Sequence, residues 1–168
     1  VTAVERWGDI WFSKHHYAFE LSKNNVVFFI NSAPKWRFSN LWSFETAVTK
    51  VAANLHVVDL KNNFPMRFLG TIFLFLNDIV NSYKLRAIKS RYPERQLIFW
   101  AFDPTRYVNV PFLMPLKRIF HVVDPYAEFP ASRRIAHNSD LVICVSPYFV
   151  DDYLEHNPNV IVVPHGIS

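Results

Sequence analysis

The last third of the chain, residues 118–168, constrains the fold most strongly because short apolar runs alternate there with more polar segments. The three runs cover residues 118–124, 140–146 and 159–164. They are largely apolar rather than alternating, a pattern typical of strands in a parallel sheet with helices on both faces. Polar residues close the runs: Asp124, Ser146 and His165. Sheets of this kind bind ligands beyond the carboxyl ends of their strands, so a site is expected there.

The rest of the chain repeats the alternation of strands and helices. Apolar runs predict strands at 26–30, 54–60 and 97–102, and residues 1–3 are expected to end another strand. Helical periodicity predicts helices over 9–22, with Asp9 as N-cap, and from Phe64-Pro65 to about Arg91. A chain of 168 residues fits one domain. The pattern therefore predicts an α/β fold, a single Rossmann-like domain over residues 1–168 with a doubly wound parallel sheet and helices on both faces.

Composition excludes several classes of protein. Half of the residues are hydrophobic (51%) and 17% are aromatic, which excludes a disordered chain. Gly8, Gly70 and Gly166 are the only glycines, whereas dinucleotide and P-loop sites need clustered glycines so that backbone amides can close on phosphates. The sequence therefore argues against an NAD-binding unit and a nucleoside triphosphatase. A single cysteine, Cys144, excludes an internal disulfide and a cysteine-based metal site.

The basic balance of the chain leaves two interpretations open. The net charge is +4 and the pI is about 9.3, but lysines and arginines are scattered, which argues against nucleic acid as a partner. Denser basic groups occur between Lys84 and Arg95 and at Arg133-Arg134. They either form solvated helix faces or, with Trp11, Trp36 and Trp42, face an anionic membrane surface. The longest apolar stretch, 68–76, is too short to span a bilayer, and the first residues do not resemble a signal peptide.

The polar strand ends and the segments between them resemble a known family. The stretches are His-Val-Val-Asp-Pro-Tyr-Ala-Glu-Phe at 121–129, Asn-Ser-Asp-Leu-Val-Ile-Cys-Val-Ser at 138–146, and Val-Val-Pro-His-Gly-Ile at 162–167. In this order and spacing they resemble the second half of the N-terminal domain of GT-B glycosyltransferases, especially the bacterial enzymes that build surface polysaccharides. Residues 9–22 are similar to the first helix of that family. The resemblance covers most of the chain and is loose between Ser32 and Gln96.

The resemblance implies one half of a GT-B architecture, namely the acceptor-side domain. Such an enzyme moves a sugar from a nucleotide-sugar donor to a glycan or lipid-linked acceptor. The donor would be bound by a C-terminal domain that follows a linker just past Ile167, so this chain would need no cofactor and would be inactive alone. The resemblance also implies a cytoplasmic protein, peripheral at the inner face of the membrane. The alternative from another class is a non-catalytic, flavodoxin-like binding or regulatory domain.

Two residues are candidates for catalysis. Asp124 ends a predicted central strand, and poor solvation there would raise the pKa of its carboxyl toward the range of a general base. Its alternative role is to cap the following helix or loop. His121 matches a histidine that many relatives carry near this strand end, and its alternative role is that of a core histidine. Residues 121 and 124 point to opposite faces of a regular strand, so both reach one ligand only if the strand ends or bulges.

The acceptor-binding candidates are Trp11, Lys14, His15, His16 and Asp103. The first four lie in the first turns of the opening helix, which lines the cleft in the family. A helix N-terminus with nearby Lys and His attracts anions, such as the diphosphate of a lipid-linked acceptor. The two histidines differ by about 100° around the helix, so one would face the ligand and the other the surface. No third ligand stands at helical spacing, so no metal site is expected. Asp103 ends a strand, and its alternative role is to form the turn before Pro104.

Overall fold

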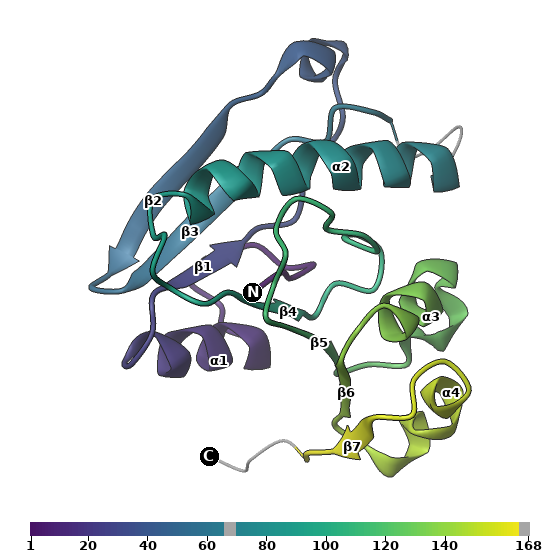
Figure 1. Ribbon diagram of the computed structural model, residues 1–168. Helices are drawn as coiled ribbons and strands as arrows, with labels where there is room; N and C mark the ends of the chain where they lie inside the picture. Colours follow the sequence, from purple (N-terminus) through teal and green to yellow (C-terminus); the bar gives the residue numbers. More distant parts are fainter. Residues whose placement is uncertain (66–69, 165–168) are drawn as a thin grey trace.

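The computed structural model describes residues 1–65 and 70–164 and shows a mixed α/β fold (Figure 1). Four parallel strands form one part of the sheet in the order β4 (Ile98–Ala101), β5 (Lys117–Val122), β6 (Leu141–Cys144) and β7 (Val160–Val162). The other part has the order β1 (Val27–Ile30), β3 (Leu55–Leu60) and β2 (Thr46–Ala52). β1 is parallel to β3, whereas β2 is antiparallel to β3.

The N-terminal residues join the two parts of the sheet. Thr2 forms parallel bridges to Ile30 at the end of β1 and to Ala101 at the end of β4. The Phe102 amide donates to the Thr2 carbonyl at 2.9 Å, and the Ala3 amide donates to the Ile30 carbonyl at 3.3 Å. Residues 1–3 thus lie between β1 and β4 and pair with both through isolated bridges, without forming a strand of their own.

Helices cover both faces of the sheet, as the apolar strand runs predict. α1 (Ser13–Ser22) and α2 (Gly70–Lys89) lie on opposite sides of the sheet, and α3 (Pro130–His137) and α4 (Asp151–Leu154) lie beside the strands β5 to β7 (Figure 1). Short 3-10 helices are η1 (Phe38–Trp42), η2 (Tyr126–Glu128) and η3 (Pro147–Phe149). No helix within 1–65 and 70–164 combines the length and the hydropathy that a membrane crossing requires.

Two apolar clusters hold these layers together. On the α1 side, Ala18 of the helix packs with Val27 and Phe29 of β1 and with Leu55 and Val57 of β3. The larger cluster lies under the other helices, where α2, α3 and α4 bury Leu85, Ile135 and Tyr153 against the opposite face. Alternate β1 residues point to the two clusters, as the pleat of a strand requires. Cys144 of β6 is a buried residue of the larger cluster.

Three local predictions need correction or fall outside the described residues. Asp9 is not the cap of α1, because the helix begins at Ser13 and His15 Nδ1 accepts from the Phe12 amide at 3.0 Å instead. β2 was not predicted, because it is an edge strand whose residues are mostly exposed and lack a continuous apolar run. The predicted start of the long helix at Phe64-Pro65 is wrong, because neither residue is helical and the helix is observed from Gly70 to Lys89. Residues 66–69 and His165, which was predicted to close the third apolar run, lie outside the described residues.

Asp78 fastens the long helix to the loop that follows β4. Its Oδ1 accepts from the Tyr107 amide at 2.8 Å and its Oδ2 from the Asn109 amide at 3.0 Å. Burial raises the pKa of Asp78 to about 6, although the two amide hydrogen bonds favour the ionised form. Folding therefore raises the proton affinity of the Asp78 carboxylate.

We expect the Asp78→Asn variant to lose a pH dependence that the parent shows. A folded-state pKa raised from 3.8 to about 6 stabilises the fold fully below about pH 4, and this contribution is lost as the pH rises through about 6. The parent's free energy of unfolding minus that of Asp78→Asn should fall by on the order of 2 to 3 kcal/mol between these limits. Urea unfolding across the pH range measures it, and a difference that stays flat or grows with pH would refute the effect.

Candidate functional site at the carboxyl edge of the sheet

The order of the strands places a switch in direction at the centre of the sheet. β1, the first strand after the N-terminal segment, lies on one side of that segment, and β4, which comes later in the chain, lies on its other side. Ligands of open α/β sheets bind at the carboxyl ends of strands at such a switch point. Here the strand ends are followed by Glu5, Asn31 and Asp103, and the neighbouring β5 is followed by Asp124.

Arg106 ties the strand ends together at the switch point. Its Nε donates to Asp103 Oδ2 at 2.6 Å, and its Nη2 donates to the carbonyls of Ala3 at 3.1 Å and Asn31 at 3.3 Å. Both members of the Arg106–Asp103 ion pair are buried. The buried Nη1 of Arg106 has no hydrogen-bond partner within the described part of the chain. A cationic donor is thus held at the centre of this edge.

Asp124 and Tyr126 form a second polar pair directly after β5. The Tyr126 hydroxyl donates to Asp124 Oδ2 at 3.0 Å. Tyr126 is buried and Asp124 is exposed. Burial raises the pKa of the Tyr126 phenol, and the carboxylates of Asp124, Glu5 and Asp103 raise it further. The phenol therefore keeps its proton and acts as a hydrogen-bond donor to Asp124.

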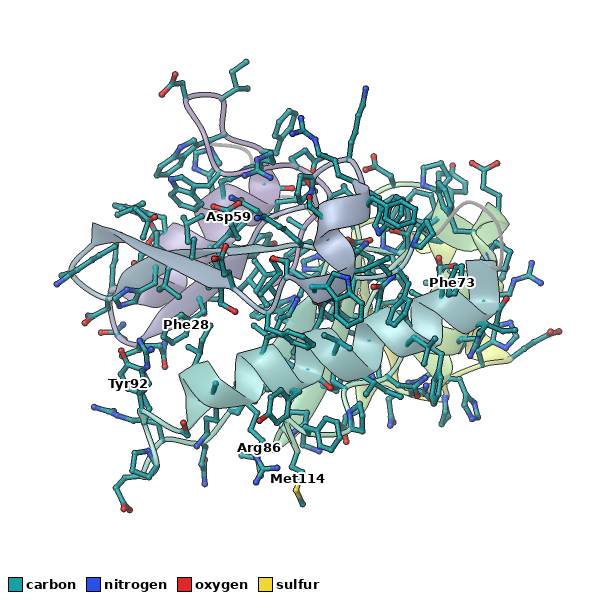
Figure 2. The ribbon with its side chains drawn as sticks, turned by 90° about the horizontal axis from the view of Figure 1, so that it is seen from above. Phe28, Asp59, Phe73, Arg86, Tyr92 and Met114 are labelled. Carbon is teal, nitrogen blue, oxygen red and sulfur yellow. The ribbon has the colours of Figure 1, made fainter. Side chains whose placement is uncertain are left out.

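A third pair joins the first helix to the same edge. Lys14, in the first turn of α1, forms an ion pair with Glu5, and the Lys14 side chain is buried. Asp59, near the end of β3 and labelled in Figure 2, accepts from Arg6 and from Asn31 Nδ2, the latter at 3.0 Å. We call the three pairs the carboxyl-edge site, made of Glu5, Lys14, Asp103, Arg106, Asp124 and Tyr126.

The structure thus brings together three of the residues predicted from the sequence, Lys14, Asp103 and Asp124. Asp103 is 1% exposed, and its Oδ1 accepts from the Thr105 amide and hydroxyl. Its turn-forming alternative is therefore observed, although it also positions Arg106. Asp124 is exposed, so the poor solvation expected from its place in the sequence is wrong. η2 begins after Pro125 without a side-chain cap, so the capping alternative for Asp124 is not observed either.

His15 is buried and supports the start of α1. Its Nδ1 accepts from the Phe12 amide, so Nε2 carries the hydrogen and donates to the Arg6 carbonyl at 3.1 Å. Its ring stacks on Phe29 at 4.9 Å, and burial lowers the pKa of His15. Both ring nitrogens are engaged within the protein, so the ring holds the loop before the helix. Its predicted role in acceptor binding stays a prediction.

His16 and Trp11 lie on the outer surface of α1. The two rings are 5.3 Å apart, and Trp11 also lies 5.3 Å from Phe19. Trp11 Nε1 donates to the Gly8 carbonyl at 3.1 Å. As expected, one of the two histidines is buried and the other is exposed, but the buried one, His15, packs in the protein core. The predicted role of Trp11 and His16 in acceptor binding stays a prediction.

His121 lies apart from the exposed carboxylate of Asp124. It is buried in a layer of aromatic rings, 4.7 Å from Phe102 and 5.2 Å from Tyr17. His121 lies within β5, in regular register with β6, whereas Asp124 follows the end of the strand at Val122. The core alternative for His121 is observed, and its predicted catalytic role has no geometric support.

Sequence reasoning missed Glu5, Arg106 and Tyr126. Each follows a strand end by only a few residues, which is the signal that could have revealed them. Their importance depends on contacts between distant segments, such as Arg106 with Ala3. Within residues 1–65 and 70–164 no cluster of His, Cys, Asp or Glu could hold a metal ion.

The surface proposed to face an anionic membrane is partly revised. Lys84 is buried, and its Nζ donates to the Lys61 carbonyl at 3.1 Å and to Asn63 Oδ1 at 2.8 Å, so it does not contribute. Burial lowers the pKa of Lys84 to about 8. Trp42 is 84% exposed in η1, whereas Trp36 is partly buried and donates to the Asn63 carbonyl.

An apolar cavity of about 280 Å³ lies elsewhere, toward the amino ends of β1 and β4. Phe28 and Tyr92 form part of its lining, with ring centroids 5.6 Å apart (Figure 2). The carboxyl-edge site is at the opposite ends of these strands, so the cavity is not part of it.

No protein-family model matches the chain, and a search of the curated proteins finds no significant relative. The chemistry of the carboxyl-edge site must therefore carry any functional conclusion.

Proposed function

We propose that this chain is the acceptor-side domain of a glycosyltransferase that moves a sugar from a nucleotide-sugar donor to a glycan or lipid-linked acceptor. The observation that carries the proposal is the Asp124–Tyr126 pair beside the switch point of a Rossmann-like sheet. A carboxylate held by a neutral phenol and open to solvent suits a group that must receive a proton from a sugar hydroxyl. The resemblance in sequence order supports the same assignment.

The proposed reaction assigns a role to each polar pair. The acceptor oxygen attacks the anomeric carbon of the donor sugar, and its proton passes to Asp124. The bond between the anomeric carbon and the phosphate oxygen breaks, and the nucleoside diphosphate leaves with the electron pair. Tyr126 holds the Asp124 carboxylate in place through the 3.0 Å hydrogen bond. Lys14 and Arg106 form ion pairs with Glu5 and Asp103 and hold these two carboxylates in place near the phenol.

In this proposal a second domain binds the nucleotide sugar. Gly8 and Gly70 stand apart in the structure, and neither belongs to a glycine-rich loop that could close on a diphosphate. We also propose that the enzyme works at the cytoplasmic face of the membrane as a peripheral protein. The exposed aromatic rings of Trp42 and Phe38 support this location.

We expect the isolated chain to bind acceptor but not donor. Calorimetric titration with uridine and guanosine diphosphate sugars should give no micromolar binding, because the chain lacks a phosphate-binding glycine loop. Titration with polyprenyl-diphosphate-linked saccharides in micelles should shift the amide resonances of Lys14 and Tyr126, and micelles alone should not. Micromolar binding of a nucleotide sugar, or acceptor shifts confined to other parts of the chain, would contradict the proposal.

A further inference from the structure

A second polar site lies at the amino edge of the sheet, away from the carboxyl-edge site. It is an open depression of about 400 Å³ where the end of α3 meets the turn after α4 and the loop after β4. Figure 1 shows α3 and α4 next to each other beside β6 and β7. We call it the basic depression, and it is lined by Asn109, Arg133, Arg134, His137, Asn138 and His156.

Asparagine side chains hold the three segments of the basic depression together. Asn157 Nδ2 donates to the carbonyls of Ala136 at 2.8 Å and Ser139 at 2.6 Å, which fixes the turn carrying His156 against the end of α3. Asn138 Nδ2 donates to the Val108 carbonyl at 3.0 Å, which fixes the loop carrying Asn109. Asn157 is buried, so these contacts are shielded from water. The three backbone segments that carry the lining residues are therefore held together by the protein itself.

The charges around the basic depression are not balanced by carboxylates. Its lining contains two guanidinium groups, two imidazoles and two amides, and no acidic side chain. In the described part of the chain, neither arginine nor either histidine belongs to an ion pair. The buried carboxylate of Asp78, which accepts from the Asn109 amide, uses both oxygens on main-chain amides. The guanidinium groups of Arg133 and Arg134 are thus available to bind an anion.

The end of a helix explains only part of this arrangement. Basic residues in a last turn complement the negative end of the helix dipole, which accounts for Arg134 and His137 in α3. It does not account for His156 and Asn109, which come from other segments and face the same depression. Convergence of donors from three segments on one concave surface is typical of a binding site.

We propose that the basic depression binds the phosphate group of a phosphorylated ligand. Guanidinium groups match phosphate oxygens with paired N–H donors, and the Asn109 amide and the imidazoles add further donors. A phosphate group could come from a soluble phosphate ester or from the headgroup of a lipid, and both present the same chemistry. The site is independent of the carboxyl-edge site and of the proposed transferase activity.

Calorimetric titration with inorganic pyrophosphate tests the proposal. We expect Arg134→Gln and Arg133→Gln each to weaken binding by about tenfold or more, since each removes a charge-assisted hydrogen bond. Arg91→Gln removes an exposed arginine outside the basic depression and serves as the matched control, which should bind like the parent. His156→Gln provides a further variant of the lining if an arginine variant fails to fold.

Equal pyrophosphate binding by the parent and the lining variants would overturn the proposal, as would a loss as large in Arg91→Gln. Vesicles distinguish the two sources of phosphate. The ligand is a lipid headgroup if the protein sediments with vesicles that contain phosphatidic acid, does not sediment with neutral vesicles, and loses this sedimentation in the Arg134→Gln variant. Pyrophosphate binding without sedimentation identifies a soluble phosphate ester. Absence of binding to both probes would refute the site.

Discussion

If the chain belongs to a glycosyltransferase, as we propose, the Asp124→Asn substitution is expected to lower the turnover of that enzyme roughly a hundredfold or more. The amide that replaces the carboxylate has the same size and could still accept from the Tyr126 hydroxyl, but it could not take a proton from the acceptor. Folding should be unaffected, because Asp124 is exposed and caps no helix. Steady-state kinetics with saturating donor measures the effect.

Two controls separate a base from a residue that only shapes the loop. Tyr126→Phe should lower turnover by only about tenfold, since it removes one neutral donor and leaves the carboxylate. Asp9→Asn alters an exposed carboxylate outside the carboxyl-edge site and should leave turnover unchanged. Near-normal turnover in Asp124→Asn would end the assignment, and a melting temperature well below that of the parent would assign Asp124 a structural role.

The second large effect is expected on stability. Asp103→Ala should lower the free energy of unfolding by on the order of 3 to 5 kcal/mol, because it leaves the buried Arg106 guanidinium without its counterion. The substitution also removes the acceptor of the Thr105 amide and hydroxyl. Urea unfolding followed by circular dichroism measures the loss of stability. The substitution is also expected to loosen the contacts that Arg106 makes between the carboxyl ends of the strands.

The matched control is an exposed ion pair. Glu20→Ala breaks the pair between Glu20 and Lys23 on α1, whose side chains are both more than half exposed, and should cost less than about 1 kcal/mol. Combining Asp103→Leu with Arg106→Met should recover part of the loss, since no buried charge then remains unpaired. A cost for Asp103→Ala no larger than for Glu20→Ala would show that Arg106 is not held by this pair.

The fold was largely predictable because strand and helix positions depend on local apolar patterns. The runs that predict β1, β3, β4, β5 and β6 supply buried residues of the apolar clusters, where a continuous apolar sequence is stable. The run that predicts β7 forms a strand as well, but Ile161 and Val162 of this strand are exposed. β2 was not predicted from the sequence, because this exposed edge strand has no continuous apolar run. The start of α1 was misplaced because a histidine, rather than Asp9, accepts the hydrogen bond of the capping residue.

The carboxyl-edge site was only partly predictable because its geometry joins distant segments. Asp124 stands out in the sequence as the polar end of an apolar run, and Tyr126 could be found beside it. Arg106 follows the end of β4 by a few residues, but its contacts with Ala3 and Asn31 could not be predicted, because only the order of the strands brings these residues to it. The inward orientation of His15 likewise depends on its hydrogen bond to the Arg6 carbonyl, a contact that helical periodicity does not reveal.

Sugar transfer by the complete enzyme tests the central claim most directly. The protein, with the donor-binding domain that we propose, is incubated with labelled uridine or guanosine diphosphate sugars and with membranes that supply lipid-linked acceptors. The account predicts that label moves into the glycan or lipid fraction, and that Asp124→Asn reduces the transfer while Arg91→Gln does not. Failure of every donor to transfer its sugar, or full transfer by Asp124→Asn, would contradict the account.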